Sequence, residues 1–135
     1  MRLKMNSDKQ APFVFFDSHR GYDTAKAFYV RIDPGIALPA ELLRALYYGL
    51  WFPGYFGFNW NALYDCLTDL EWITCQKVII AHEGVPALPD SEFKVYLEVL
   101  RDAALSWEVG CEHKLEILFR EVDRGMIERF LNSGV

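Results

Sequence analysis

Apolar residues recur along this chain with two different periods, and segments of the two kinds alternate. Short runs of aromatic and β-branched residues predict strands at 12–18, 27–33, 77–84 and 114–122. Apolar residues at three- and four-residue spacing predict helices at 38–50, 60–70, 89–107 and 123–134. Strands separated by helices are typical of a parallel sheet covered by helices, so the pattern predicts an α/β fold.

Two of the expected helices have clear apolar stripes and clear start signals. The stripes consist of Leu42, Leu43, Leu46 and Leu50 in the first helix, and of Phe93, Leu97, Leu100 and Ala104 in the helix at 89–107. Pro39 suits the first turn of one helix, and Asp90 or Ser91 can cap the other. The strands at 12–18 and 27–33 are candidates for a hairpin with a long connection.

The chain shows no domain boundary and no internal repeat. We expect one domain over 1–135, with a compact centre at about 27–120. Residues 1–26 then form an N-terminal extension and 121–135 a C-terminal segment.

Composition and charge narrow the function classes. The 135 residues are 52% hydrophobic and 16% aromatic, which is enough to fill a core. The formal net charge of −5 argues against direct nucleic-acid binding, which needs a basic surface, and is compatible with a basic protein partner.

Targeting and metal signals are weak. Cys66, Cys75 and Cys111 lack metal-site spacing, so we expect reduced thiols in a cytoplasmic protein. The apolar run near the start is too short for a signal peptide, and no stretch approaches the length of a membrane span. No cofactor-binding motif is present, and we expect no cofactor and no metal.

The stretch YFGFNWNALYDCLTDL, residues 55–70, divides into two helix faces. Trp60, Leu63, Leu67 and Leu70 form a face that belongs in the core, and Asn59 can cap the helix. The other face carries Asn61, Asp65 and Asp69, with Tyr64 and Thr68 beside them. Asp69 is expected in the last turn, where the helix dipole disfavours an anion.

The surroundings of this stretch favour an interface over a simply solvated face. No Lys or Arg occurs from Ala45 to Gln76, and ten aromatic residues crowd the same window. They cannot all fit a core of this size, so some rings are expected at the surface beside unpaired carboxylates. Exposed aromatic residues flanked by one sign of charge are typical of a protein interface, here for a basic partner.

The stretch resembles the central motif of the barstar-like ribonuclease inhibitors, whose pattern is tyrosine, aromatic, Gly, any residue, Asn, apolar, Asp, Ala, Leu, aromatic, Asp, Cys, Leu, Thr. YLEVLRDA at 96–103 and GCEHKLEILF at 110–119 are similar to that family's later helix and final strand. The resemblance covers about 27–120. It implies a three-stranded parallel sheet packed by helices, here with an extra N-terminal strand and a C-terminal helix.

The resemblance also implies an inhibitor that plugs a nuclease active site with this helix and the loop before it. Tyr55, Asn59, Tyr64, Asp65 and Asp102 match the family's contact positions, with Asp65 in place of a substrate phosphate. Cys66 and Cys111 match its structural cysteines. Gly57 is expected where a side chain would be forbidden, and Asn61, Thr68 and Asp69 complete the expected surface.

One position departs from the family, which usually has an aspartate where this chain has Asn61. The change removes a negative charge, so binding to the family's best-known nuclease is in doubt. Two alternatives remain: a module that binds a basic non-nuclease protein, and a small enzyme that uses Asp65, Asp69 or Asp102. His19, His82 and His113 lie in separate elements and in no nucleophile motif, which disfavours the enzyme. The free chain is expected to be a monomer.

Overall fold

The computed structural model describes residues 11–107 and 110–133. Its elements are, in order, β1 (Phe13–Phe16), β2 (Ala27–Ile32), α1 (Pro39–Gly49), α2 (Trp60–Leu67), β3 (Lys77–His82), α3 (Asp90–Ser106), β4 (Lys114–Arg120), the 3-10 turn η2 (Glu121–Asp123) and α4 (Arg124–Asn132). Every expected strand and helix is present. None of the helices in these described ranges is long and apolar enough to cross a membrane.

The four strands form one parallel sheet in the order β1-β4-β3-β2. The predicted α/β class is therefore confirmed, with β2, β3 and β4 as the three expected strands and β1 as the extra one. The expected hairpin between the first two strands is wrong, because β1 and β2 occupy opposite edges of the sheet. β1 pairs with β4 instead, where the ring of Phe13 lies 5.2 Å from that of Phe119.

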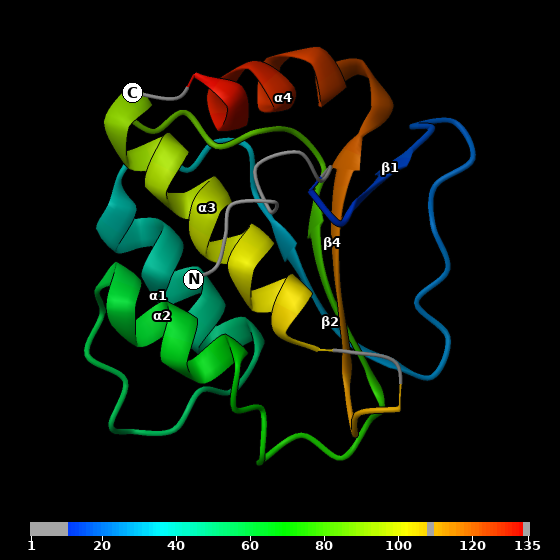
Figure 1. Ribbon diagram of the computed structural model, residues 1–135, viewed down its shortest axis with the longest axis vertical. Coiled ribbons are helices and arrows are strands. Elements are labelled where there is room, and N and C mark those ends of the chain that lie inside the picture. The colour runs from blue at the N-terminus through cyan, green and yellow to red at the C-terminus, as the bar shows by residue number, and fades with distance from the viewer. Residues whose placement is uncertain (1–10, 108–109, 134–135) are drawn as a thin grey trace.

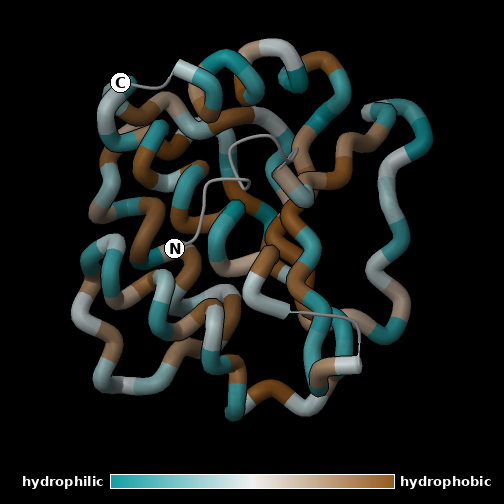
Figure 2. The backbone as a smooth tube through the Cα atoms, viewed as in Figure 1, coloured by the Kyte–Doolittle hydropathy of each residue, from teal (hydrophilic) through white to brown (hydrophobic). Residues whose placement is uncertain are grey.

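The helices α1, α2 and α3 cover one face of this sheet, as Figure 1 shows. Side chains that point from the strands toward these helices alternate along the sequence, as in Val78 and Ile80 of β3 and Leu115 and Ile117 of β4. They meet the predicted helix stripes, whose residues are all buried. The hydrophobic segments of the chain accordingly lie in the strands and on the parts of the helices that face the sheet (Figure 2).

A strap, residues 17–26, runs along the opposite face of the sheet and joins its two edges (Figure 1). A second, smaller cluster of Phe16, Ile79, Ala81 and Leu118 lies there, with Tyr22 of the strap packed against it. The Tyr22 hydroxyl donates a 2.6 Å hydrogen bond to Glu83 and accepts one from Arg31 at 3.1 Å. One tyrosine therefore holds the strap to the ends of two strands.

Two helix ends differ from the expectations. α3 begins directly after Pro89, and neither Asp90 nor Ser91 caps it with its side chain. α2 ends at Leu67 rather than near residue 70. Leu70 then takes a left-handed backbone conformation with φ of 50°, which directs its fully buried side chain into the core.

Candidate functional site

Asn59 sets the start of α2. Its side-chain oxygen accepts a 2.7 Å hydrogen bond from the backbone N–H of Ala62, as predicted for a helix cap. Its amide nitrogen donates back to the carbonyl of Gly57 at 3.4 Å, so one side chain joins the loop to the helix. The expectation that a side chain is forbidden at Gly57 is wrong. An added Cβ would make ordinary contacts, the nearest at 3.4 Å from Asn59, and the φ of Gly57 is not left-handed.

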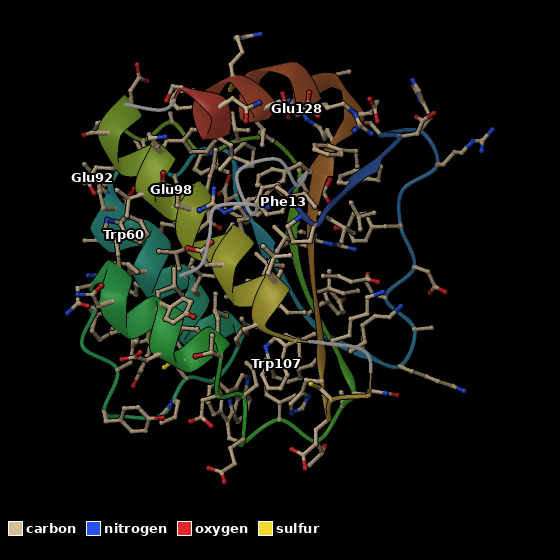
Figure 3. The ribbon with its side chains drawn as sticks, viewed as in Figure 1. Phe13, Trp60, Glu92, Glu98, Trp107 and Glu128 are labelled. Carbon is tan, nitrogen blue, oxygen red and sulfur yellow. The ribbon has the colours of Figure 1, made fainter. Side chains whose placement is uncertain are left out.

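The inner face of α2 packs into the core. Leu63 and Leu67 are fully buried, as expected, and Cys66 joins them. Trp60 is only half-buried, because its indole N–H reaches out to Glu92 of α3 at 2.8 Å. Figure 3 shows these two side chains at the same end of the helix pair. This hydrogen bond, together with the packing between the helices, fixes α2 against α3.

The outer faces of α2 and α3 enclose a cleft of about 380 Å³. It is lined by Asn61, Tyr64, Asp65, Val95, Glu98, Val99 and Asp102. Four of the predicted contact residues therefore come together, although Asp102 lies far from the other three in the sequence. We refer to this hollow as the acidic cleft.

The sequence reasoning missed the α3 side of the acidic cleft apart from Asp102. Val95, Glu98 and Val99 precede it at spacings of seven, four and three residues, so all four lie on one helix face. That spacing was visible in the sequence. Glu98, labelled in Figure 3, adds a third carboxylate to those of Asp65 and Asp102.

Two of the three carboxylates already have cationic neighbours. Lys94 lies 3.2 Å from Glu98, and Arg101 donates a 2.9 Å hydrogen bond to Asp102. Asp65 is exposed and makes no salt bridge with any residue that the structure describes. It is therefore the carboxylate most available to a cation from outside the chain.

Tyr55, Asp69 and Thr68 lie outside the acidic cleft. The Tyr55 hydroxyl donates a 3.1 Å hydrogen bond to Asp69, and desolvation together with that bond raises the pKa of the phenol. Asp69 directly follows the C-cap residue Thr68 instead of occupying the last turn of α2 as expected, and it still lies near the negative end of the helix dipole. The Thr68 hydroxyl donates to the backbone carbonyls of Tyr64 and Asp65, which closes the helix end.

The aromatic residues of this region divide between core and surface, as expected. Phe52 and Phe56 are buried, and Tyr47, Trp60 and Trp72 are partly buried. The exposed rings are Tyr48, Trp51, Tyr55, Phe58 and Tyr64. The surface around α2 thus combines carboxylates with exposed rings.

The chemistry of the acidic cleft favours binding over catalysis. No histidine lines it: His82 and His113 are buried elsewhere, and His19 lies on the strap. Burial raises the pKa of the Cys66 thiol to about 11, so this thiol is protonated at neutral pH and is a poor nucleophile. Within the described residues, no group of His, Cys, Asp and Glu side chains is arranged to hold a metal ion.

Comparison with known proteins agrees with this arrangement. The family model described as Barstar (barnase inhibitor) matches residues 27–120, which include β2, β3, β4, α1, α2 and α3. No curated protein and no solved structure matches the chain. Because the match covers well over half of the sequence, the chain belongs to the Barstar family of barnase inhibitors.

Proposed function

We propose that this protein inhibits a basic ribonuclease or toxin nuclease by covering its active site with the acidic cleft and the loop before α2. It does so in the cytoplasm, without a cofactor, and as a monomer until it meets the nuclease. The observation that carries the proposal is that Asn61, Tyr64, Asp65 and Asp102 line one cleft in a chain of a barnase-inhibitor family.

Asp65 is the central residue of the proposed contact. Nuclease active sites hold phosphate groups with cationic side chains, and an exposed carboxylate without an ion-pair partner can take the place of that phosphate. Tyr64, on the preceding position of α2, supplies an exposed ring next to this carboxylate. The ring excludes water around the new ion pair, which strengthens it.

The remaining predicted residues shape and extend this surface. Asn59 and Gly57 hold the loop to the start of α2, and Tyr55 and Asp69 form a second acidic, aromatic pair beyond its end. Helix and loop are thereby ordered before binding, which reduces the entropy lost on association.

The test is inhibition of RNA hydrolysis by purified barnase, followed by capture of nucleases from cells that contain the chain. We expect the wild-type chain to inhibit a nuclease stoichiometrically. Asp65→Ala should weaken binding at least about 100-fold, as truncation of a central charged contact does. Asp23→Ala is a matched control, because Asp23 is an exposed carboxylate on the strap and does not line the acidic cleft.

Circular dichroism of Asp65→Ala should match that of the wild-type chain, because the side chain is exposed. If no nuclease is inhibited, or if Asp65→Ala inhibits as well as the wild type, the proposal fails. Capture of a basic protein without nuclease activity would indicate a different kind of partner.

A further inference from the structure

Three exposed rings beside α2 belong to none of the contact positions proposed above. Tyr48, in the last turn of α1, is 68% exposed, Trp51 is 74% exposed, and Phe58, just before the cap of α2, is 46% exposed. We call these three side chains the aromatic ledge. Large rings held in water bury little area, so the fold alone gives no reason for them.

The backbone of Trp51 is also unusual for an exposed ring. α1 ends with a hydrogen bond from the Phe52 N–H to the Tyr47 carbonyl at 2.9 Å, and Trp51 adopts φ of 58° within that closing turn. This left-handed position at the end of a helix usually belongs to glycine, because a Cβ there is strained. Trp51 is therefore both strained and exposed.

A comparison with Leu70 shows why this combination is unusual. Leu70 has a similar left-handed backbone, with φ of 50°, but its side chain is fully buried and its packing offsets the strain. Trp51 has no such burial, and Phe58 has φ of 54° with nearly half of its surface exposed. Strain that folding does not offset is found at functional positions. Among the described residues other than glycine, the only further one with both a left-handed backbone and an exposed side chain is Lys26 of the strap, which is a charged turn residue.

Packing beneath the aromatic ledge holds it in place. The ring of Tyr47 lies 5.0 Å from the ring of Tyr48 and 5.0 Å from that of Phe58, so it joins two members of the ledge. The indole N–H of Trp72 donates a 2.9 Å hydrogen bond to the carbonyl of Leu50, next to Trp51. The rings therefore project from an ordered support, which lowers the entropy lost when they bind.

The charge around the ledge selects the kind of occupant. The segment from Ala45 to Gln76 contains no Lys or Arg and contains Asp65, Asp69 and Glu71. Arg44 is the nearest cation in the sequence, and it shares a cleft of about 440 Å³ beside Tyr48 with Asp33 and Glu41, which leaves that cleft with a net negative charge. Exposed rings in a negative field favour a cation with a flat face, and the arginine guanidinium stacks on rings better than the lysine ammonium does.

We propose that the aromatic ledge binds arginine side chains of the basic partner by stacking, and so extends the contact from the acidic cleft to the end of α1. The identity of that partner rests on the proposed function, but the preference for arginine does not. A second copy of this chain is a poorer occupant, because two ledges face to face would bring the acidic surfaces of both α2 helices together.

The experiment titrates the chain with two peptides of equal charge, nona-arginine and nona-lysine, and compares their affinities. The acidic residues attract both, whereas the ledge distinguishes them. We expect the wild-type chain to prefer nona-arginine, and Trp51→Gly to lower that preference roughly two- to fivefold, as one exposed cation–π contact does. Tyr48→Ala combined with Phe58→Ala should lower it by a similar factor.

Two controls separate the ledge from the rest of the surface. Asp65→Ala should weaken both peptides alike and keep the preference for arginine. Tyr29→Ala removes a ring that is 41% exposed on β2, away from α2, and should leave both affinities unchanged. Trp51→Gly should unfold at the wild-type temperature or above it, because glycine relieves the strained backbone.

A preference that survives in Trp51→Gly and in the Tyr48→Ala, Phe58→Ala double variant overturns the proposal. So does equal binding of the two peptides, binding of neither, or self-association of the wild-type chain in sedimentation that Trp51→Gly abolishes. The nuclease-inhibition assay reports separately on the proposed function. The proposed function can fail while the preference for arginine holds, and the preference can be absent while the nuclease is inhibited.

Discussion

Asn61 and Asp65 lie one turn apart on α2 and line the same cleft, yet only Asp65 carries a charge. The family usually has an aspartate at the position of Asn61. Under the proposed function, a cationic group of the nuclease that pairs with two carboxylates in other members would meet one carboxylate and one amide here, and the amide forms the weaker hydrogen bond.

We accordingly predict that Asn61→Asp binds purified barnase about tenfold tighter or more than the wild-type chain, a gain of about 1.4 kcal/mol or more, because a carboxylate attracts a cationic group more strongly than an amide does. Isothermal titration measures the change. Asn132→Asp, at the exposed end of α4, makes the same charge change away from the cleft and should have little effect. Equal effects of both variants would point to net charge rather than to the acidic cleft.

His82 is a buried residue whose protonation opposes folding. It is fully buried, its Nδ1 lies 2.8 Å from the Leu118 carbonyl and its Nε2 lies 2.7 Å from the Tyr96 hydroxyl, and its ring stacks 4.0 Å from Phe119. A neutral imidazole that donates from Nδ1 and accepts at Nε2 satisfies both bonds. Burial lowers the pKa of His82 to about 4.

The sign of the pH effect follows from this lowered pKa. Between the unfolded value of about 6.5 and the folded value of about 4, the unfolded chain binds a proton that the folded chain does not. We predict that the free energy of unfolding falls by on the order of 3 kcal/mol over this window as the pH is lowered, and is unaffected by His82 above it. Urea titrations at several pH values measure the slope. His82→Gln should flatten it, whereas His19→Gln, in the exposed strap, should not; equal slopes in the two variants would refute this assignment.

At the scale of single elements, the helices could be predicted from the sequence because their apolar stripes decide which face enters the core. The end of α2 could not be predicted, because the Thr68 hydroxyl bonds back to the helix and Leu70 turns into the core through a conformation rare for leucine. The partner of β1 was also missed. Strand pairing depends on contacts between segments that are distant in the sequence, here Phe13 with Phe119. The hydrophobic pattern within one segment does not reveal such contacts.

The inner face of α2 gives an element-level prediction. Leu67→Ala should lower the free energy of unfolding by about 2–5 kcal/mol, because it leaves a cavity in a fully buried site. Leu105→Ala, on α3 and 40% exposed, is the matched control and should cost much less. Thermal or urea unfolding measures both, and similar losses would mean that α2 is not held by this face.

The candidate site shows the same division between local and distant information. Asn61, Tyr64 and Asp65 could be predicted from spacing because one helix carries them. Val95, Glu98 and Val99 lie on another helix, and only the packing of α2 against α3 makes them part of the same cleft. That some rings of this segment are exposed could be expected from the sequence, but that Trp51 and Phe58 are among them depends on how the chain packs.

At the scale of the whole molecule, the net charge of −5 and the cation-free segment around α2 should guide a basic nuclease to the site. We predict that the association rate constant falls about tenfold or more as the ionic strength rises from about 0.01 M to about 0.15 M, where the Debye length shortens from about 30 Å to about 8 Å. The dissociation rate constant should change far less. Stopped-flow fluorescence measures both constants, and an association rate that does not respond to salt would contradict steering by charge.

The position of β1 at the edge of β4 has a consequence for synthesis of the chain. Phe13 pairs with Ile117, so β1 has no partner until the chain about a hundred residues further on has been synthesised. At a rate of synthesis of about 5–20 residues per second, the apolar FVFF segment stays unpaired and exposed to water for roughly 5 to 20 seconds. Such a segment is prone to pair with other chains, and Asp17, directly after it, places a charge where that pairing would extend.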